Sequence, residues 1–298
     1  MTKKNLVVVR AGANSLHSHW LDLPYAERNF EMLVSFFSEE AYATFVPAEG
    51  VRAVLVKGGK WDGLFKTLSD LDLDEFDYFW LPDDDIEAST GSINKIFELC
   101  QRYGLAVGQP SLSRKSYFSH FLLSRCAGFR IRYTNYVEIM VPCLNRALLR
   151  RALPYFENTM SGFGLDYIWC RWEEAGAFRS AVIDAVEVFH TRPVGKVLKS
   201  AMDATGCPKS EQEEGHLKAK FDLTRRTVPI AFAGVLDNGQ PVSGRLIMAL
   251  YMCRSWVKEL KTFRSPREAG WGILKVARRQ ALRSLEMWLL WPAAAKSR

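Results

Sequence analysis

Short apolar runs alternate with segments of helical spacing through residues 1–199 of the chain. The apolar runs that predict strands lie at 6–9, 30–37, 51–56, 76–81, 106–109, 135–142 and 181–189. Most of these runs are apolar at consecutive positions, as expected for strands covered on both faces. The alternation predicts an α/β sandwich of the Rossmann type with a mostly parallel central sheet.

Helical periodicity fills the spaces between several of these runs. Leu64, Leu68 and Leu71 fall on one side of a helix predicted for residues 60–71. Ser89 and Thr90 are suited to cap a helix that continues to about Gly104, where glycine permits the chain to turn. Further helices are predicted after residue 142, up to about 155, and from Gly164 onward.

A change of composition separates the last part of the chain from this pattern. Gly, Pro, Ser and Glu accumulate around residues 200–215, so the division predicted is a catalytic domain at 1–199, an irregular linker at 200–240 and a helical extension at 241–298. Two amphipathic helices are expected in the extension. Their apolar faces carry Leu246, Ala249, Leu250, Cys253, Val257 and Leu260 in the first, and Leu274, Ala277, Ala281, Leu285 and Trp288 in the second.

The charge of the chain is concentrated in that extension. The whole chain has 40 Lys and Arg against 33 Asp and Glu, a balance of +7, whereas residues 241–298 hold 12 against 3, a balance of +9. Residues 1–240 therefore have 28 against 30, or −2, and offer no basic surface of the kind that binds nucleic acid. The extension could instead contact an anionic membrane, or its apolar faces could pack on the catalytic domain.

The cysteine pattern and the N-terminus indicate a cytoplasmic protein. The 6 cysteines are scattered without a Cys-x-x-Cys pair, which is typical of reduced thiols. The first apolar run is too short for a signal peptide and is interpreted as a strand. No run approaches the roughly 20 apolar residues that span a bilayer.

The acidic triplet Asp83-Asp84-Asp85 is the most informative motif. It follows an aromatic strand, and ligands bind at the carboxyl ends of strands in α/β sheets. Adjacent carboxylates repel one another unless a cation joins them. Asp83 and Asp85 can point the same way and supply hard oxygen ligands for Mg²⁺ or Mn²⁺. The alternative interpretation is a solvated turn that starts the next helix.

His190 ends the last predicted strand and could reach the same edge of the sheet. A neutral imidazole there would complete a metal site of two aspartates and one histidine. The loop that follows, Thr191-Arg192-Pro193-Val194-Gly195-Lys196, provides the close backbone approach and positive charge that a diphosphate needs. A histidine bonded to a backbone carbonyl is the alternative.

Two further turns follow strands and could contact a phosphorylated ligand. Lys57-Gly58-Gly59-Lys60-Trp61 opens a helix, whose N-terminus favours an anion, but it lacks the spacing of a P-loop. Arg10-Ala11-Gly12-Ala13-Asn14 follows the first strand. Each could equally be a plain turn between elements.

Two acidic residues outside the triplet are candidates for acid–base chemistry. Asp166 lies in the first turn of a predicted helix, where the helix dipole stabilises a carboxylate, and could act as a general base. Glu138 is unusual because it lies in an apolar run, where its side chain either faces solvent or lines a site.

These motifs, in this order, resemble the GT-A superfamily of nucleotide-sugar glycosyltransferases. More closely, the chain resembles a plant-and-bacterial GT-A-like family of unassigned function, over roughly residues 5–197. The resemblance is carried by Tyr78-Phe79-Trp80-Leu81-Pro82-Asp83-Asp84-Asp85, Gly108-Gln109-Pro110-Ser111-Leu112, Val137-Glu138-Ile139-Met140-Val141-Pro142, Gly164-Leu165-Asp166 and Val188-Phe189-His190.

The resemblance implies a role for each motif. Asp83 and Asp85 would form the Asp-x-Asp motif that holds Mn²⁺ or Mg²⁺ against the donor diphosphate, with His190 as a third ligand. Asp166 would act beside the acceptor, which favours inversion, although the order His190, Gly195, Lys196 loosely resembles an element of retaining enzymes. Residues expected on the donor side are Arg10, Asn14, Lys57, Lys60, Trp61, Asp83, Asp84 and Lys196.

The expected function is transfer of a sugar from a UDP- or GDP-type donor to a glycan or lipid-linked glycan, in bacterial surface polysaccharide synthesis. The enzyme would lie on the cytoplasmic face of the inner membrane through its basic helices. Two alternatives remain: a nucleotidyltransferase or phosphohydrolase that uses the same aspartates, and a non-catalytic protein that binds anionic surfaces.

Overall fold

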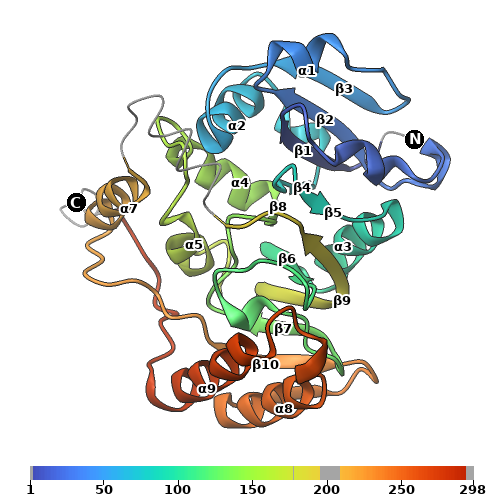
Figure 1. Ribbon diagram of the computed structural model, residues 1–298. Helices are drawn as coiled ribbons and strands as arrows, with labels where there is room; N and C mark the ends of the chain where they lie inside the picture. Colours follow the sequence, from blue (N-terminus) through green and yellow to red (C-terminus); the bar gives the residue numbers. More distant parts are fainter. Residues whose placement is uncertain (1–2, 177, 195–208, 293–298) are drawn as a thin grey trace.

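A computed structural model describes residues 3–176, 178–194 and 209–292 of the chain, and it is organised around one large mixed sheet (Figure 1). The strand order is β11-β10-β7-β9-β6-β8-β4-β1-β2-β3, and β5 pairs with β9 outside this path. The strands are β1 Asn5–Ala11, β2 Glu31–Phe36, β3 Val51–Leu55, β4 Tyr78–Trp80, β5 Ile86–Glu87, β6 Val107–Leu112, β7 Phe129–Thr134, β8 Cys143–Asn145, β9 Ser180–His190, β10 Ala231–Leu236 and β11 Pro241–Ser243.

Helices lie on both sides of this sheet, so the predicted α/β sandwich is confirmed. Strands β3, β2, β1 and β4 are parallel, as are β6 and β9, whereas β8, β7, β10 and β11 pair antiparallel with their neighbours. In Figure 1, α3 lies on one side of the strands, and α2, α4 and α5 lie on the other. The helices are α1 Glu39–Ala43, α2 Lys60–Ser69, α3 Thr90–Arg102, α4 Arg146–Ala152, α5 Leu165–Ile168, α7 Ser210–Lys220, α8 Arg245–Lys258 and α9 Pro266–Leu282.

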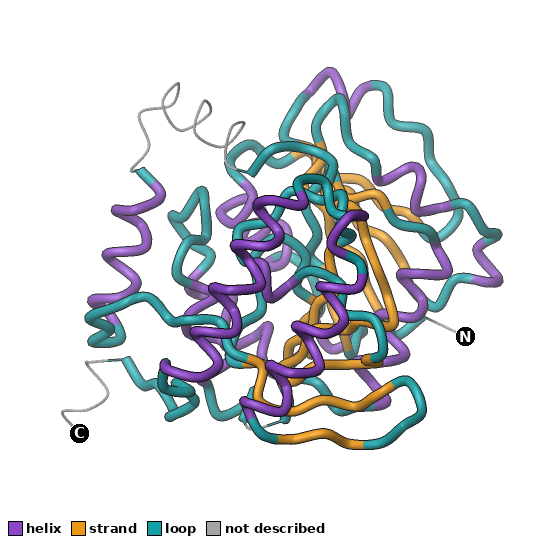
Figure 2. The backbone as a smooth tube through the Cα atoms, turned by 60° about the horizontal axis from the view of Figure 1, so that its bottom comes forward, coloured by secondary structure: helices purple, strands orange, loops and turns teal. Residues whose placement is uncertain are grey.

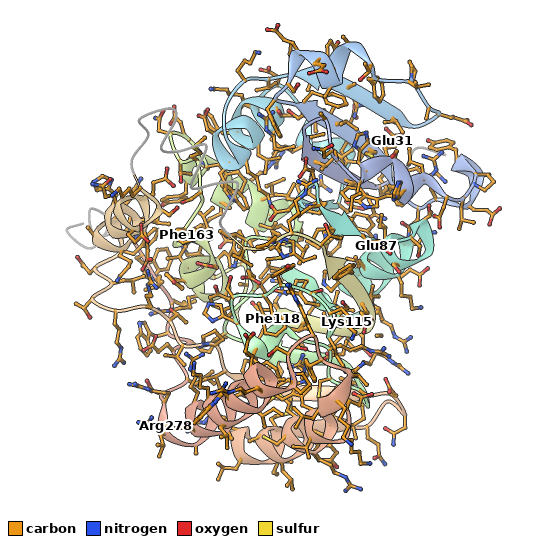
Figure 3. The ribbon with its side chains drawn as sticks, viewed as in Figure 1. Glu31, Glu87, Lys115, Phe118, Phe163 and Arg278 are labelled. Carbon is orange, nitrogen blue, oxygen red and sulfur yellow. The ribbon has the colours of Figure 1, made fainter. Side chains whose placement is uncertain are left out.

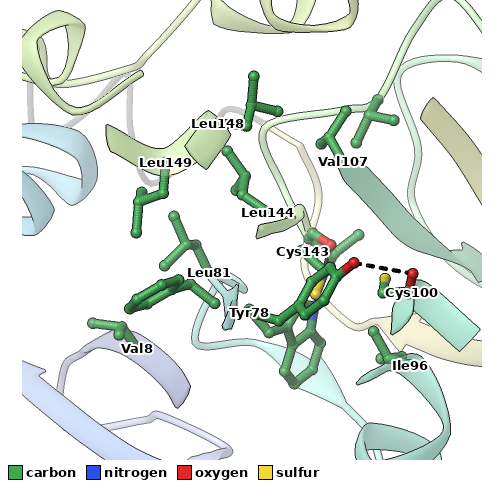
Figure 4. Close-up of a cluster of buried hydrophobic side chains, with 14 of the residues drawn as sticks. Val8, Tyr78, Leu81, Ile96, Cys100, Val107, Cys143, Leu144, Leu148 and Leu149 are labelled. Carbon is green, nitrogen blue, oxygen red and sulfur yellow. Dashed lines mark hydrogen bonds between the residues drawn. The ribbon is translucent and has the colours of Figure 1, made fainter. Parts of the chain in front are cut away.

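The core between sheet and helices is built from the apolar runs of the sequence. Every residue of β1 is buried, and so are the inward positions of α3, which Ser89 caps by accepting a hydrogen bond from the backbone of Ser92. Figure 4 shows this packing around Tyr78, whose hydroxyl donates to the carbonyl of Cys100 at 3.1 Å. The buried hydroxyl therefore keeps a partner inside an apolar cluster.

Residues 135–142 do not form the strand predicted from their apolar run. They form a buried irregular segment between β7 and β8. Donors from several elements satisfy its carbonyl groups: the indole of Trp169 donates to Val137 at 2.9 Å, that of Trp80 to Val141 at 3.1 Å, and Lys60 to Ile139 at 2.8 Å. The backbone N–H groups of Leu81 and Asp83 donate to Pro142 and Met140, each at 2.9 Å. Because these donors replace a neighbouring strand, the segment can be apolar and buried without joining the sheet.

The C-terminal part of the chain extends the same sheet. The segment 200–240, predicted to be irregular, contains α7 and β10 within its described portion, and β10 pairs with β7. Helices α8 and α9 lie across these strands (Figure 2). A second core, distinct from the main one, contains Met248, Met252 and Trp256 of α8 together with Ile273 and Val276 of α9.

A buried ion pair joins the two cores. Arg132 of β7 and Asp184 of β9 are both fully buried and form two bonds, from Nε to Oδ2 at 2.6 Å and from Nη2 to Oδ1 at 2.9 Å. Asp184 lies where β9 departs from regular pairing, because Pro110 pairs with Ile183 but the next residue, Ser111, pairs with Glu187. The ion pair thus fills an irregularity in the longest strand.

Among the described residues, no helix combines the length and the apolar character needed to cross a bilayer.

Candidate active site

The acidic triplet lies directly after β4, at the carboxyl end of the parallel strands. The backbone N–H of Asp83 donates to the carbonyl of Met140 at 2.9 Å, and the carbonyl of Asp84 accepts from Leu16 at 2.7 Å. These bonds fix the turn on both sides. The predicted location of the triplet at the ligand-binding edge of the sheet agrees with this geometry.

Asp83, Asp85 and His190 meet at one point. One ligand atom from each lies within 4.8 Å of the others. Strand β9 brings His190 there, because Ile86 of β5 pairs with His190 directly beside Asp85. Two residues that lie 105 positions apart in the sequence (190 − 85) are therefore held together by a short antiparallel pairing.

Hydrogen bonds orient the imidazole of His190. Its Nδ1 lies 2.8 Å from the carbonyl oxygen of Tyr117, which can only accept, so Nδ1 carries the proton. Its Nε2 faces Oδ2 of Asp85 at 3.2 Å. Burial lowers the pKa of His190, but the carboxylate of Asp85 more than offsets this and leaves the pKa above its usual value. The nitrogen that a metal would need points toward the carboxylates.

Lys60, the first residue of α2, neutralises part of this negative charge. Its ammonium group donates to Oδ1 of Asp83 at 2.5 Å and to the carbonyl oxygens of Ile139 and Met140 at 2.8 and 3.2 Å. The turn at Gly58-Gly59 places this lysine, and with it the N-terminus of α2, beside the acidic turn. Positive charge at this point suits an anionic ligand that approaches the carboxylates.

Asp84 has a different environment from its two neighbours. Its Oδ2 accepts from the backbone of Gly12 at 3.1 Å, and its Oδ1 accepts from Nη1 of Arg192 at 3.1 Å. Arg192 also donates to the carbonyl of Asn14. Burial raises the pKa of Asp84, although these two donors oppose the shift. Asp84 therefore joins the loop after β1 to the loop after β9.

The structure places the other residues expected on the donor side in contact with neighbouring elements, and not with the acidic triplet. Arg10 is buried and donates to Ser35, Val56 and Gly58, so it supports the turn before α2. Trp61 is buried against Phe156 and Trp169. Lys57 is 63% exposed and pairs with Glu39 at 2.9 Å. Lys196 lies outside the described residues.

Asp166 is buried in the short helix α5. Gly164 precedes it with φ 103°, a conformation that favours glycine and starts the short helix α5. The hydroxyl of Tyr136 donates to Oδ2 of Asp166 at 2.6 Å, while Oδ1 is buried without a partner among the described residues. Burial raises the pKa of Asp166 to about 7, against the opposing effect of Tyr136. A carboxyl group with such a pKa can take up a proton near neutral pH.

Glu138 links the metal-ligand group to Asp166. It belongs to the irregular segment 135–142, and its backbone N–H donates to Oε1 of Gln109 at 2.6 Å. Its Oε2 is buried and has no partner in the described structure. Burial raises its pKa to about 7, and its charge interacts with those of Asp166, His190 and Asp83. Of the two alternatives for this acid, a side chain that faces solvent is wrong, because Glu138 is buried.

Two contacts within the site were not predicted from the sequence, although the loop that contains Arg192 was expected near a diphosphate. The pairing of Arg192 with Asp84 could have been suspected, because Arg192 follows His190 closely. The bond from Tyr136 to Asp166 had no indication in the sequence, since these residues are brought together only by the irregular path of 135–142.

The three clustered ligands fit a divalent ion of the magnesium or manganese type. Two carboxylate oxygens and one imidazole nitrogen are a donor set that such ions accept. Opposite ligands in an octahedral Mg²⁺ site stand about 4.2 Å apart at bond lengths of about 2.1 Å, so the observed spread of up to 4.8 Å needs only small side-chain rotations. The remaining coordination positions would be free for water or phosphate.

Comparisons with known proteins give distant structural similarities only. No protein-family model and no curated protein matches the chain. The solved structures similar to it include Staphylococcus aureus TarS 1-349 in complex with UDP-GlcNAc, at 12% identity and a TM-score of 0.43, covering 93% of this chain and 90% of TarS. The same TarS segment without that ligand gives 12% and 0.41.

A third similar structure is Rv0371C from Mycobacterium tuberculosis H37Rv, in complex with manganese. It has 10% identity and a TM-score of 0.35, and covers 54% of this chain and 78% of its own.

Proposed function

We propose that the chain is a metal-dependent glycosyltransferase that moves a sugar from a nucleotide diphosphate to a hydroxyl group. The observation that carries this proposal is the group formed by Asp83, Asp85 and His190, with Lys60 and Arg192 beside it. Carboxylates and cations arranged around one point suit a ligand that is both phosphorylated and metal-bound.

Asp83, Asp85 and His190 would hold Mn²⁺ or Mg²⁺, which when bound would stabilise the negative charge of the leaving diphosphate. Lys60 and Arg192 add positive charge at the same place. Asn14, Lys57 and Lys196 would contact the donor from the surrounding loops, and Asp84 would contact its ribose. Arg10 and Trp61 would act through the turn and helix that place Lys60.

Asp166 is the proposed general base. Its free Oδ1 would take the proton of the acceptor hydroxyl as the acceptor oxygen bonds to the anomeric carbon and the bond to the diphosphate breaks. Tyr136 holds the other carboxylate oxygen and so keeps Oδ1 in place. A base on the acceptor side implies inversion at the anomeric carbon.

The proposed acceptor is a glycan or lipid-linked glycan of a bacterial surface polysaccharide, met at the cytoplasmic face of the inner membrane. The outer faces of α8 and α9 support membrane contact, because apolar and basic side chains alternate there. Exposed on these faces are Leu246, Ile247, Leu250, Val257, Trp271 and Leu274, with Arg254, Lys258, Lys275 and Arg278. Arg278 projects away from the body of the molecule in Figure 3.

The test is the thermal stability of the protein with UDP or GDP, each with and without Mn²⁺. We expect one nucleotide to raise the melting temperature only when the metal is present, because ligand binding to the folded state stabilises it. Replacing both Asp83 and Asp85 by Ala should remove this rise. The control is Glu87→Ala, an exposed acid next to the triplet that does not belong to the ligand group.

Product analysis separates sugar transfer from other phosphate chemistry. Incubation with the sugar nucleotide that binds should release nucleoside diphosphate. Release of monophosphate or pyrophosphate would instead indicate a phosphohydrolase or nucleotidyltransferase. Equal metal-dependent stabilisation of the wild type and the double variant would overturn the proposed role of the triplet.

A further inference from the structure

A pocket away from the acidic turn lies between Arg171, shortly after α5, and residues 286–291. It has a volume of about 330 Å³. Its principal lining residues are Arg171, Asp222, Arg225, Glu286, Trp288 and Trp291. The backbone N–H of Leu290 donates to the carbonyl of Arg171 at 2.9 Å and so holds residues 288–291 beside the pocket. Its volume falls within the range of small-molecule sites, roughly 300–1,000 Å³.

The guanidinium group of Arg171 makes no ion pair among the described residues, and the nearby charge of Glu286 offsets only part of the effect of its burial. Arg171 is only 1% exposed. Its Nη2 is buried and has no hydrogen-bond partner among the described residues. Its Nε makes one long bond, 3.4 Å, to the carbonyl of Trp288. In the described part of the chain, no carboxylate lies within ion-pair distance of it, and burial lowers its pKa to about 10. A buried cation in this state is costly unless an anion joins it.

We propose that this pocket binds the phosphate group of a ligand through Arg171. The indole of Trp288 covers one face of the guanidinium group at 4.5 Å. Nη2 has no partner and is covered in the ligand-free structure, so a phosphate would reach this edge of the guanidinium group, which can bind two phosphate oxygens in parallel, when the lining side chains shift.

The rest of the lining limits what the phosphate can be attached to. Arg225, whose side chain is 64% exposed, stands at the rim and pairs with Glu286 at 2.8 Å. Glu286 is buried, and Asp222 also faces the pocket, so the formal charge of the lining is balanced. A ligand with a single phosphate and a neutral remainder therefore suits the pocket better than a polyanion.

Two sources could supply this phosphate: a soluble phosphate ester or the headgroup of a lipid. Trp288 and Trp291 are 53% and 42% exposed at the rim, and tryptophan is frequent where proteins meet the headgroup region of membranes. The pocket and the metal-ligand group share no residue, so the proposal does not depend on sugar transfer.

The experiment uses the full chain in EDTA, so that the metal site does not contribute. One arm measures the rise in melting temperature with glycerol 3-phosphate. The other measures co-sedimentation with phosphatidylcholine vesicles that do or do not contain phosphatidic acid. We expect Arg171→Gln to bind about tenfold more weakly, since it loses a charge-assisted hydrogen bond. The matched control is Arg150→Gln, an exposed arginine that pairs with Asp74.

Each result decides the proposal. A loss of glycerol 3-phosphate binding in Arg171→Gln, but not in the control, supports a soluble ligand, and a loss confined to vesicles with phosphatidic acid supports a lipid ligand. If Arg171→Gln does not fold, Trp288→Ala replaces it, because this partly exposed side chain can be removed with less damage to the core. Equal binding by wild type and variant in both arms, or no binding by the wild type in either, would overturn the proposal.

Discussion

Two buried carboxyl groups, those of Asp166 and Glu138, have the most unusual chemistry among the side chains of this molecule. Both have pKa values raised to about 7 by burial, and each has one oxygen without a partner among the described residues. Each also has one side-chain hydrogen bond, Glu138 with Ser119 and Asp166 with Tyr136, whose hydroxyl donates to Oδ2 of Asp166 at 2.6 Å. That bond favours the ionised form and fixes the direction of the free oxygen, two properties that a base requires.

The pH dependence of transfer follows from this environment. A base with a pKa of about 7 is protonated and inactive at pH 5, so kcat/KM should rise through pH 7 and level off above it. Asp166→Asn should lower kcat by about 10²–10⁴-fold without a matching change in donor binding. Tyr136→Phe removes a bond that lowers the pKa, and so should move the rise to higher pH. An unchanged profile in both variants would contradict the assignment.

Single residues also show the limits of prediction from sequence. Asp83, Asp85 and His190 could be proposed as one group because each follows a strand, and strand ends converge at one edge of a sheet. Arg10 and Trp61 occupy similar places in the sequence, yet both are buried in packing and hydrogen bonds. Whether a residue beside a turn faces the ligand or the core depends on neighbours that are distant in the chain.

At the scale of elements, the parallel half of the sheet could be predicted and the antiparallel half could not. The runs that became β1, β2 and β3 are apolar, bounded by turns and paired with their neighbours in sequence. Residues 135–142 are also largely apolar, but several of their carbonyl groups accept from the side chains of Trp169, Trp80 and Lys60 and not from a paired strand. Apolar composition reports burial, whereas strand pairing depends on where the backbone donors and acceptors find partners.

The ion pair between Arg132 and Asp184 is the element-scale feature most sensitive to substitution. Asp184→Ala leaves a fully buried guanidinium group without its carboxylate and should reduce the free energy of unfolding by about 3–5 kcal/mol. Replacing both residues together, as Arg132→Met with Asp184→Leu, should cost less, because no unpaired charge remains. Denaturant titration of both variants measures the difference. If the double variant is as unstable as the single one, the loss of side-chain packing, and not an unpaired buried charge, causes the loss of stability.

At the scale of the whole molecule, the apolar and basic surface of α8 and α9 stands out. These helices bury one face against the sheet through Met252 and Trp256 and leave another apolar face exposed. Soluble proteins rarely leave such a surface uncovered. The two acids within these helices and their connection are Glu259, which pairs with Arg114, and Glu268 in the first turn of α9. This excess of basic over acidic side chains supports the proposed contact with anionic lipids.

Negative charge introduced on this face should weaken the proposed binding to anionic membranes. Leu250→Glu combined with Trp271→Glu introduces two acids where exposed apolar side chains now lie, and should reduce binding to anionic vesicles at least tenfold. Metal-dependent nucleotide binding should not change, because these residues are far in the fold from the acidic turn. Val46→Glu, which alters another exposed apolar residue near α1, is the control. Full vesicle binding by the double variant would exclude this face as the contact.

The irregularity in β9 affects which face of the sheet each later side chain of the strand points to. Alternate residues of a strand point to opposite faces, and Asp184, Ala185 and Val186 lie between two stretches that pair with β6. The number of residues in this interval decides whether residue 190 or its neighbour turns toward Asp85. Deleting one residue there would present Thr191 in place of His190, although every strand could still form. The length of the interval around the buried salt bridge, in the middle of β9, thus sets which side chain arrives at the carboxyl end of the strand.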